Sequence, residues 1–441
     1  MRLINETKPK KKHGRTLLLA LLLPVLAGLG WLVLRDTTPP ALTIKPDQGF
    51  LGRSSSITVT AQDEGAGLKR LVVQIKQGDK VKISVEKAFS SATRHHAETI
   101  SLEGQPLDEG SIEVIARADD AGFFLFAHSQ ETTANLTLDS KPPRISPVSV
   151  QHNLTQGGSG LTAFEVNEDL RACGIAVGER FFPAYRQENG RYLCLFAMPW
   201  DTVPASFNPV IQASDLAGNN AERQLGHFAK AKTFRHDRLN LPESFLVSKG
   251  ELFQRVFPND PETDPLGRYI KINNVLRKQN RAKLLEIGLD TSTTPLWNGE
   301  FLRSPGRSTA LFADNRDYYY NGVAVDNQTH LGVDLAHQQN SPIAASNNGR
   351  VVYADFLGIY GECVILDHGI GLQTIYSHLS RIDVKVGDTL TKGQILGLSG
   401  MTGLAGGDHL HFGVLVSGVP VQPQEWWDRS WITNNITLRF D

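Results

Sequence analysis

Two histidines flank a single leucine in the segment HLHFGVLV, residues 409–416. This segment otherwise has the composition of a buried strand, and residues i and i+2 of a strand point to the same face. His409 and His411 are therefore expected to project into one space. Two hydrogen-bonded histidines in a half-buried strand would give the same pattern, so a chemical role requires partners elsewhere in the chain.

Two other segments offer such partners. THLGVDLA (329–336) contains His330 and Asp334, four residues apart, with Gly332 between them to allow close approach of the backbone. IYSHLS (375–380) contains His378. A catalytic zinc ion takes three protein ligands from His, Asp or Glu and leaves one position for water. The five residues therefore suffice for three ligands and two groups that act on the water.

These motifs, in this order, resemble the signature of the lysostaphin/LytM-type zinc metalloendopeptidases. The resemblance covers roughly residues 306–427, about a quarter of the chain. It is carried by three motifs and by the segments around them, which include PIAASNNGRVV, VILDHG and VKVGDTLTKGQILGLSG. The three motifs are His330-x-x-x-Asp334, His378-Leu379-Ser380 and His409-x-His411-Phe412.

The resemblance implies one Zn²⁺ per chain, bound by His330, Asp334 and His411. His378 and His409 are then the catalytic pair: one takes or orients the proton of the attacking water, and the other hydrogen-bonds the tetrahedral oxyanion. The sequence does not assign these two roles between them. The family substrate is bacterial peptidoglycan, and stem-peptide crosslinks are the expected bonds if the cell has two membranes.

The chain departs from the family pattern beside its His-x-His pair. Asp408 stands where relatives often have Pro, and Gly413 stands where they often have Glu. Neither position holds a ligand in the family, so these residues bear on substrate preference, because they are expected to border the groove. Upstream, Phe312-Ala313 replaces the usual Phe-Gly, with Arg316 in place. Tyr376 and His337 are interpreted as residues outside the metal site.

The pattern of the whole chain predicts a mainly β, multidomain protein. Segments such as SITVTAQ (56–62) alternate like strands, whereas 242–257 and 273–289 have helical spacing. Nearer the C-terminus, GRVVYADF (349–356), GECVILDHG (361–369), LQTIYSHL (372–379) and HLHFGVLV (409–416) are predicted strands. A Pro-Pro entry recurs at DTTPP (36–40) and DSKPP (139–143) and suggests two immunoglobulin-like sandwiches. The predicted parts are module 1 (37–140), module 2 (141–232), a helical connector (233–305), a compact antiparallel β metallopeptidase domain (306–430, hereafter the C-terminal domain) and a C-terminal strand or tail (431–441).

The N-terminus has the pattern of a membrane anchor. Residues 1–15 form a basic tail, and residues 16–34 contain no charged side chain. This uncharged segment is long enough for a transmembrane helix. The flanking cations place the tail in the cytoplasm and the rest of the chain outside it, in the periplasm if there are two membranes. A cleaved signal peptide is the alternative. Residues 16–34 are thus expected to bind the inner or cytoplasmic membrane.

Net charge and cysteine content limit the partners and the redox chemistry. The net charge of −1 argues against nucleic acid as a partner, whereas the β modules could bind cell-envelope proteins. Three cysteines exclude a disulfide scaffold. Cys173 and Cys194 are expected either to form a bridge or to be two buried thiols, and Cys363 is expected in the core.

The function that the sequence favours is a membrane-anchored zinc endopeptidase of the cell wall. Two other classes stay open. Degenerate relatives lose ligands and activate other wall hydrolases, although all five site residues are present here. The two β modules alone would also suit an adhesion or scaffolding protein, which would not explain the histidines. Finally, the connector precedes the C-terminal domain and could cover its groove, holding the enzyme latent.

Overall fold

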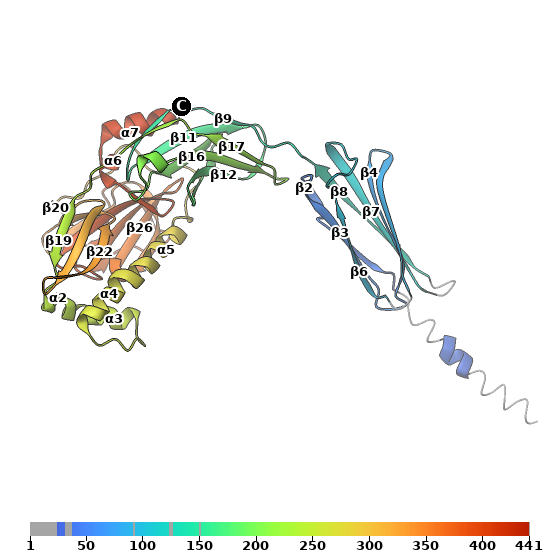
Figure 1. Ribbon diagram of the computed structural model, residues 1–441, viewed down its shortest axis with the longest axis horizontal. Helices are drawn as coiled ribbons and strands as arrows, with labels where there is room; N and C mark the ends of the chain where they lie inside the picture. The colour runs from blue at the N-terminus through green and yellow to red at the C-terminus, as the bar shows by residue number, and fades with distance from the viewer. Residues whose placement is uncertain (1–23, 31–37, 91–92, 123–126, 150, 441) are drawn as a thin grey trace, which may run out of the picture. The chain divides into compact units, whose positions relative to one another are not determined.

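The computed structural model describes residues 24–30, 38–90, 93–122, 127–149 and 151–440 (Figure 1). Clustering of contacts divides the chain into two units. The first comprises Met1–Lys141 with Leu216–Asn219, and the second comprises Pro142–Asp215 with Asn220–Asp441. Each unit has a hydrophobic core of its own.

The predicted membrane anchor falls mostly outside the described residues. Residues 24–30 are helical, whereas the remainder of 16–34 and the basic tail 1–15 lie outside the described ranges. Within those ranges, no helix combines the length and the apolar character that a membrane crossing requires. The anchor therefore stays a prediction.

Module 1 is built from two mostly antiparallel sheets around one core. Strand β3 shows why: Ile57, Val59 and Ala61 alternate with polar residues and are all fully buried. One sheet has the order β1-β3-β6 and the other β2-β8-β7-β4-β5. The strands are β1 Ala41–Lys45, β2 Gln48–Leu51, β3 Ser56–Gln62, β4 Leu68–Gln77, β5 Lys80–Ala88, β6 His95–Ser101, β7 Gly110–Asp120 and β8 Ser129–Leu138. That the module is of the immunoglobulin type stays a prediction.

Module 2 has two four-stranded sheets, with orders β14-β15-β11-β9 and β13-β12-β16-β17, and a parallel pair β10-β18. Cys173 and Cys194 lie on different sheets and are free, buried thiols, as is Cys363. The strands are β9 Ile145–Pro147, β10 His152–Thr155, β11 Ser159–Val166, β12 Leu170–Val177, β13 Arg180–Pro183, β14 Tyr185–Arg186, β15 Tyr192–Ala197, β16 Pro209–Asp215, β17 Asn220–Gln224 and β18 His227–Lys230.

The C-terminal domain is centred on an eight-stranded sheet, and its own strands pair antiparallel. The path runs β20-β23-β31-β27-β26-β25-β29, with β32 paired to β31. Four strands match the predicted segments within one residue: β25, β26, β27 and β31. The strands of this sheet are β20 Arg307–Ala310, β23 Val333–Ala336, β25 Gly349–Phe356, β26 Glu362–Gly369, β27 Leu372–Leu379, β29 Thr389–Leu390, β31 His409–Val416 and β32 Val419–Val421.

Two smaller sheets complete the domain. One has the order β24-β30-β28, with β24 Pro342–Ala344, β30 Ile395–Leu398 and β28 Arg381–Ile382. The other has the order β19-β21-β22, with β21 Asp314–Tyr320 and β22 Val323–His330. Its first strand, β19 (His236–Asn240), comes from the connector and pairs parallel with β21. The connector is thus part of the fold of the C-terminal domain.

The rest of the connector is helical where the spacing predicted helices. Its elements are α2 Glu243–Ser248, α3 Gly250–Val256, α4 Pro265–Lys271, a π-helical turn Ile272–Leu276 and α5 Arg277–Ile287. Their apolar residues, such as Phe253 and Leu284, pack on the outer face of the central sheet in a shared core. The end of α5 approaches the sheet so closely that a side chain at Gly288 would collide with the backbone of Gly418.

Of the two alternatives predicted for residues 431–441, a strand or a tail, the strand is wrong for the described part of this segment. It forms α7 (Arg429–Asn435) followed by a 3₁₀ turn (Thr437–Arg439). The Asp428 carboxylate accepts hydrogen bonds from the backbone amides of Ser430 and Trp431 and so begins the helix. Ile432 and Ile436, about one helical turn apart, are both buried.

Module 2 and the C-terminal domain share one continuous core. The short helix α6 (Pro423–Trp427), which precedes α7, contributes to this core. Glu425 accepts hydrogen bonds from the backbone amide of Ser159 at 2.9 Å and from its hydroxyl at 3.3 Å. Trp426 is fully buried and donates to the same hydroxyl. The predicted boundary near residue 232 therefore does not separate two independent cores.

Glu425 makes the stability of this second unit depend on pH. Burial raises its pKa from 4.5 to about 7, although the bonds from Ser159 act to lower it. The native state thus binds this proton more tightly than the unfolded chain, so the stabilisation is complete below pH 4.5 and is lost as the pH rises through 7. We expect a loss of about 3 kcal/mol in the free energy of unfolding between pH 4.5 and 8 from this group.

Urea unfolding followed by tryptophan fluorescence measures this effect, because every tryptophan except Trp31 lies in the second unit. Glu425→Gln is the matched variant, since glutamine keeps the shape and cannot ionise. We expect the difference in the free energy of unfolding between wild type and Glu425→Gln to change across this pH range. An identical pH slope in both proteins would contradict the role of Glu425.

Candidate metal centre and active site

Three strand segments bring His330, Asp334 and His411 together. His330 is the last residue of β22, Asp334 lies in β23, and His411 lies in β31. Asp334 and His411 are direct partners in the antiparallel pair β23–β31. The chain passes from β22 to β23 through Gly332, where a Cβ atom would lie 2.5 Å from His411 Nε2. Only glycine allows this approach of the backbone to the ring.

The polar atoms of these three residues converge on one point. His330 Nε2, Asp334 Oδ1 and His411 Nδ1 are each 2.9 Å from the other two. All three residues are less than 9% exposed. A tetrahedral zinc ion with bonds of about 2.0–2.2 Å has ligand atoms roughly 3.4 Å apart, close to this triangle.

The hydrogen bonds at the back of the site determine which atoms carry protons. His330 Nδ1 donates to the carbonyl oxygen of Leu311 at 2.9 Å, which leaves the lone pair of Nε2 directed into the triangle. Burial lowers the pKa of His411 to about 4. Burial acts to raise the pKa of Asp334, but His330 and the other histidines outweigh it and hold this pKa well below 3.8. The triangle thus combines one carboxylate oxygen with two imidazole nitrogens, a donor set that fits a divalent cation.

Arg316 supports the carboxylate from the other side. Its guanidinium, on β21, lies 3.3 Å from Asp334 Oδ2, the oxygen that does not face the histidines. This contact fixes the orientation of the carboxylate and leaves Oδ1 for the triangle. The position of Arg316 in the sequence does not by itself indicate this contact.

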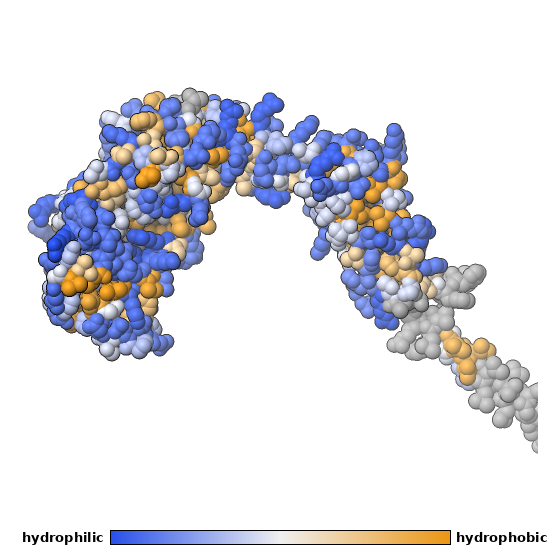
Figure 2. Space-filling model, viewed as in Figure 1, coloured by the Kyte–Doolittle hydropathy of each residue, from blue (hydrophilic) through white to orange (hydrophobic). Residues whose placement is uncertain are grey.

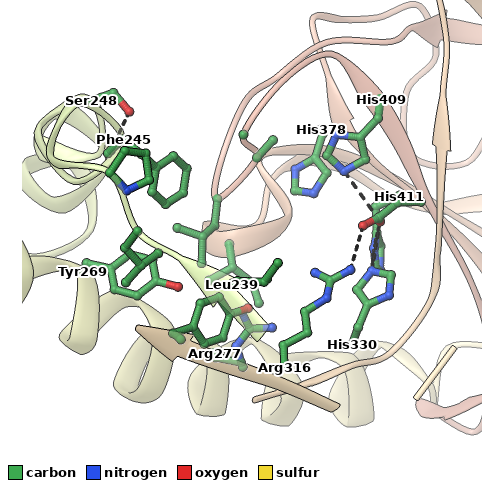
Figure 3. A pocket seen from close by; sticks show the side chains of 18 of the residues that line it. Leu239, Phe245, Ser248, Tyr269, Arg277, Arg316, His330, His378, His409 and His411 are labelled. Carbon is green, nitrogen blue, oxygen red and sulfur yellow. Dashed lines mark hydrogen bonds and ion pairs between the residues drawn. The ribbon is translucent and has the colours of Figure 1, made fainter. Parts of the chain in front are cut away.

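His409 and His378 lie next to the triangle, at the positions expected for the catalytic pair. His409 shares the face of β31 with His411, as the strand period predicted, and its Nε2 is 3.5 Å from Asp334 Oδ1. The ring centroids of His378 and His409 are 4.8 Å apart. Figure 3 shows the two rings side by side on the same side of the pocket as His411 and His330.

Each of these two histidines is held by a backbone carbonyl. His378 Nδ1 donates to Thr402 O and His409 Nδ1 donates to Gly407 O, both at 2.8 Å. The Nε2 atom of each ring is therefore the one that can exchange protons in the cleft, and that of His409 also lies 3.5 Å from Asp334 Oδ1. His378 also has a φ of 63° where the pairing of β26 and β27 shifts register. Such backbone strain at a non-glycine residue is typical of functional sites.

The surroundings shift the pKa values of His378 and His409 in opposite directions. Burial, reinforced by the neighbouring His409 and His411, holds the pKa of His378 well below 6.5. Burial also acts to lower the pKa of His409, but its bond to Asp334 outweighs this and raises the pKa above 6.5.

The site lies at one side of a cleft of about 570 Å³. The connector forms the other side, so it borders the cleft and does not close it. Figure 3 shows Phe245 and Tyr269 of the connector across the pocket from the histidines. Figure 2 shows apolar side chains gathered where Figure 1 places α2, α4 and β22, in line with the apolar cluster around Leu241, Leu246 and Tyr269.

Tyr360 and the connector residues of this cleft are not among the site residues predicted from the sequence. Tyr360 lines the cleft with its ring 5.6 Å from the His411 ring. It lies in an apolar run, and no spacing relative to the histidines indicates it. The sequence pattern of the connector does not predict that its residues reach the cleft either, because their position depends on tertiary packing.

Other residues singled out in the sequence do not line the cleft. Asp408 accepts hydrogen bonds from Ser399 Oγ and Asn340 N, and Gly413 packs against Ile375. Both residues were expected to border the groove, and neither lines the cleft. Tyr376 is a core tyrosine whose hydroxyl accepts a bond from the Ser346 amide. His337 contacts the Ser304 hydroxyl at 3.3 Å and stands outside the triangle.

Comparison with known proteins identifies relatives for the C-terminal part of the chain. Residues 328–423 match peptidase family M23. The chain is 41% identical over 92 residues to the peptidoglycan DD-endopeptidase ShyA of Vibrio cholerae, covering 21% of each chain. It is 37% identical over 123 residues to an uncharacterized metalloprotease of Haemophilus influenzae, covering 28% of this chain and 25% of the relative. The matched segment thus spans a quarter or less of these two relatives.

A solved structure also matches part of the chain. The catalytic domain of the antimicrobial peptidase lysostaphin from Staphylococcus simulans is 28% identical, with a TM-score of 0.22, and the match covers 30% of this chain and 89% of that domain.

Proposed function

We propose that this chain, which carries a C-terminal M23 peptidase domain, is a zinc endopeptidase that hydrolyses peptide crosslinks in bacterial peptidoglycan. The observation that carries the proposal is the triangle of His330, Asp334 and His411, whose three lone-pair atoms converge at 2.9 Å. The Vibrio cholerae relative, named a peptidoglycan DD-endopeptidase, supports the choice of substrate.

In this proposal His330, Asp334 and His411 hold the zinc ion. When bound, zinc supplies a Lewis acid that lowers the pKa of a water molecule to about 7 and polarises the scissile carbonyl. His378 Nε2, whose pKa is lowered, is suited to accept the proton of the attacking water. His409, whose pKa is raised, is suited to donate a hydrogen bond to the developing oxyanion or a proton to the leaving amine.

The place of the enzyme in the cell is also a proposal. The uncharged segment 16–34 after a basic tail supports a single-pass anchor in the cytoplasmic membrane, with the remaining chain outside the cytoplasm. Module 1 and module 2 then lie between the anchor and the M23 domain in the sequence, where they could contact other cell-envelope proteins.

Digestion of purified peptidoglycan tests the activity directly. We expect the zinc-loaded full chain to release peptide-cleaved fragments, identified by mass spectrometry, and a zinc chelator to stop the release. Protein shown to carry zinc that releases nothing would overturn the enzyme proposal. It would favour the alternative, a non-hydrolytic activator of other wall hydrolases.

Removing the connector should damage the enzyme and not activate it. A truncated chain that begins at residue 306 loses β19, the partner of β21, and exposes the apolar face that packs on α3 and α5. Burying a large apolar side chain stabilises a fold by about 1.5–3 kcal/mol, so loss of several contacts should unfold or aggregate the domain. Thermal unfolding and size-exclusion chromatography of this chain, compared with one that begins at residue 233 and so differs from it only in the connector, measure the effect. A folded and more active short chain would instead support a latency function of the connector.

A further inference from the structure

We propose that Arg277 of the connector binds a carboxylate of the substrate, so that the enzyme selects peptides that carry an acidic group near the scissile bond. This inference rests on the proposed peptidase function and adds a specificity residue to it. Arg277 is the first residue of α5 and lines the cleft. Figure 3 shows it between Tyr269 and Arg316, on the approach to the histidines.

The guanidinium is held on one edge and open on the other. Its Nε donates to the carbonyl oxygen of Asn273 at 3.1 Å, and its Nη2 donates to Asn273 Oδ1 at 2.5 Å. Asn273 is fully buried, and its amide donates to Asp326 at 2.7 Å. Within the described ranges, no carboxylate forms an ion pair with Arg277, and its Nη1 has no hydrogen-bond partner. The free edge presents the donors that bind a carboxylate.

The charges that line the cleft favour an anionic ligand. Asp334 is the only acidic residue among those that line it, and it already contacts Arg316 and the histidines. Arg277 is thus a partly buried cation without a counter-charge in the cleft. Because an unpaired charge in such a place is costly, a substrate carboxylate would gain both a charge-assisted hydrogen bond and relief of this cost.

The helix that carries Arg277 is fixed relative to the metal residues. Asn280 Oδ1 accepts a hydrogen bond from the amide of Ile359, the neighbour of Tyr360, at 2.8 Å. Gln373, on β27 with His378, donates to the carbonyl oxygen of Ile287 at 3.0 Å. The cation and the triangle therefore belong to one packed frame, and a substrate can contact both without a rearrangement. The π-helical turn directly before Arg277 is a further feature that is frequent at functional sites.

A matched pair of substrates tests the inference with the zinc-loaded full chain. A synthetic crosslinked peptide is made in two forms, one with free side-chain carboxylates and one with carboxamides. We expect wild type to cleave the carboxylate form with at least about tenfold higher kcat/KM. Arg277→Gln should remove this preference, with a large loss on the carboxylate form and less than about a twofold loss on the carboxamide form. Lys278→Gln, an exposed change on the same helix, is the control and should change neither value.

Binding to the chelator-treated chain provides a second readout that needs no turnover. Isothermal titration calorimetry should show weaker binding of the carboxylate peptide to Arg277→Gln, with unchanged binding of the carboxamide peptide. Equal losses on both peptides would show a merely structural role, and a wild type without preference in binding or cleavage would overturn the inference. Cleavage of both forms without preference would leave the proposed peptidase function intact. Preferential binding of the carboxylate peptide without any cleavage would support the role of Arg277 and contradict the proposed peptidase function.

Discussion

Replacing His411 with alanine should reduce the zinc content from one ion per chain to a small fraction and abolish turnover. His411 supplies one of three converging atoms, and a catalytic zinc site has only three protein ligands. The two remaining residues cannot form a closed site. The loss of turnover should exceed the roughly 10²–10⁴-fold that removal of a general acid–base group costs.

Two measurements check this expectation independently of activity. Metal analysis of the purified protein gives the zinc content. Added zinc should raise the melting temperature of wild type, because a ligand at 100 times its Kd stabilises the native state by about 2.7 kcal/mol. His411→Ala should lose this response. His337→Ala is the control, since His337 stands outside the triangle and should keep both zinc and response. Unchanged zinc in His411→Ala would refute the ligand assignment.

The strands of the site were predictable because their signal is local. β25, β26, β27 and β31 each combine apolar or β-branched residues with flanking glycines or turns, and each was located within one residue. The same period placed His409 and His411 on one face. The need for glycine at position 332 also follows from its place between two candidate ligands, and the collision of a Cβ there with the His411 ring confirms it.

The parts that the sequence did not reveal depend on tertiary contacts. β19 reads HDRLN, which has no alternation of buried residues and becomes a strand only because β21 offers an edge. Tyr360 and Arg277 reach the cleft through the packing of separate elements. The positive φ of His378 arises where β27 shifts its register against β26, and no residue type in YSHLS signals such a bulge.

Replacing His378 with asparagine should leave one zinc ion per chain and lower kcat by about 10²–10⁴-fold. His378 does not belong to the triangle, and its Nε2 is free because Nδ1 donates to Thr402 O. Asparagine is the informative substitute, because it tolerates the left-handed φ of 63° at this position better than most residues. The loss then reports the missing imidazole and not a changed backbone.

His409→Ala should have the same signature, with zinc retained and turnover lost. If the two histidines act on the same proton-transfer step, the double variant should be little worse than either single variant, because residues that act as a unit are not additive. Zinc analysis and single-turnover kinetics on all three proteins measure this. Loss of zinc in His378→Asn would place His378 among the ligands, and retained turnover in either single variant would remove that histidine from the mechanism. Additive losses would instead mean that His378 and His409 serve separate steps, one at the attacking water and one at the oxyanion or the leaving amine.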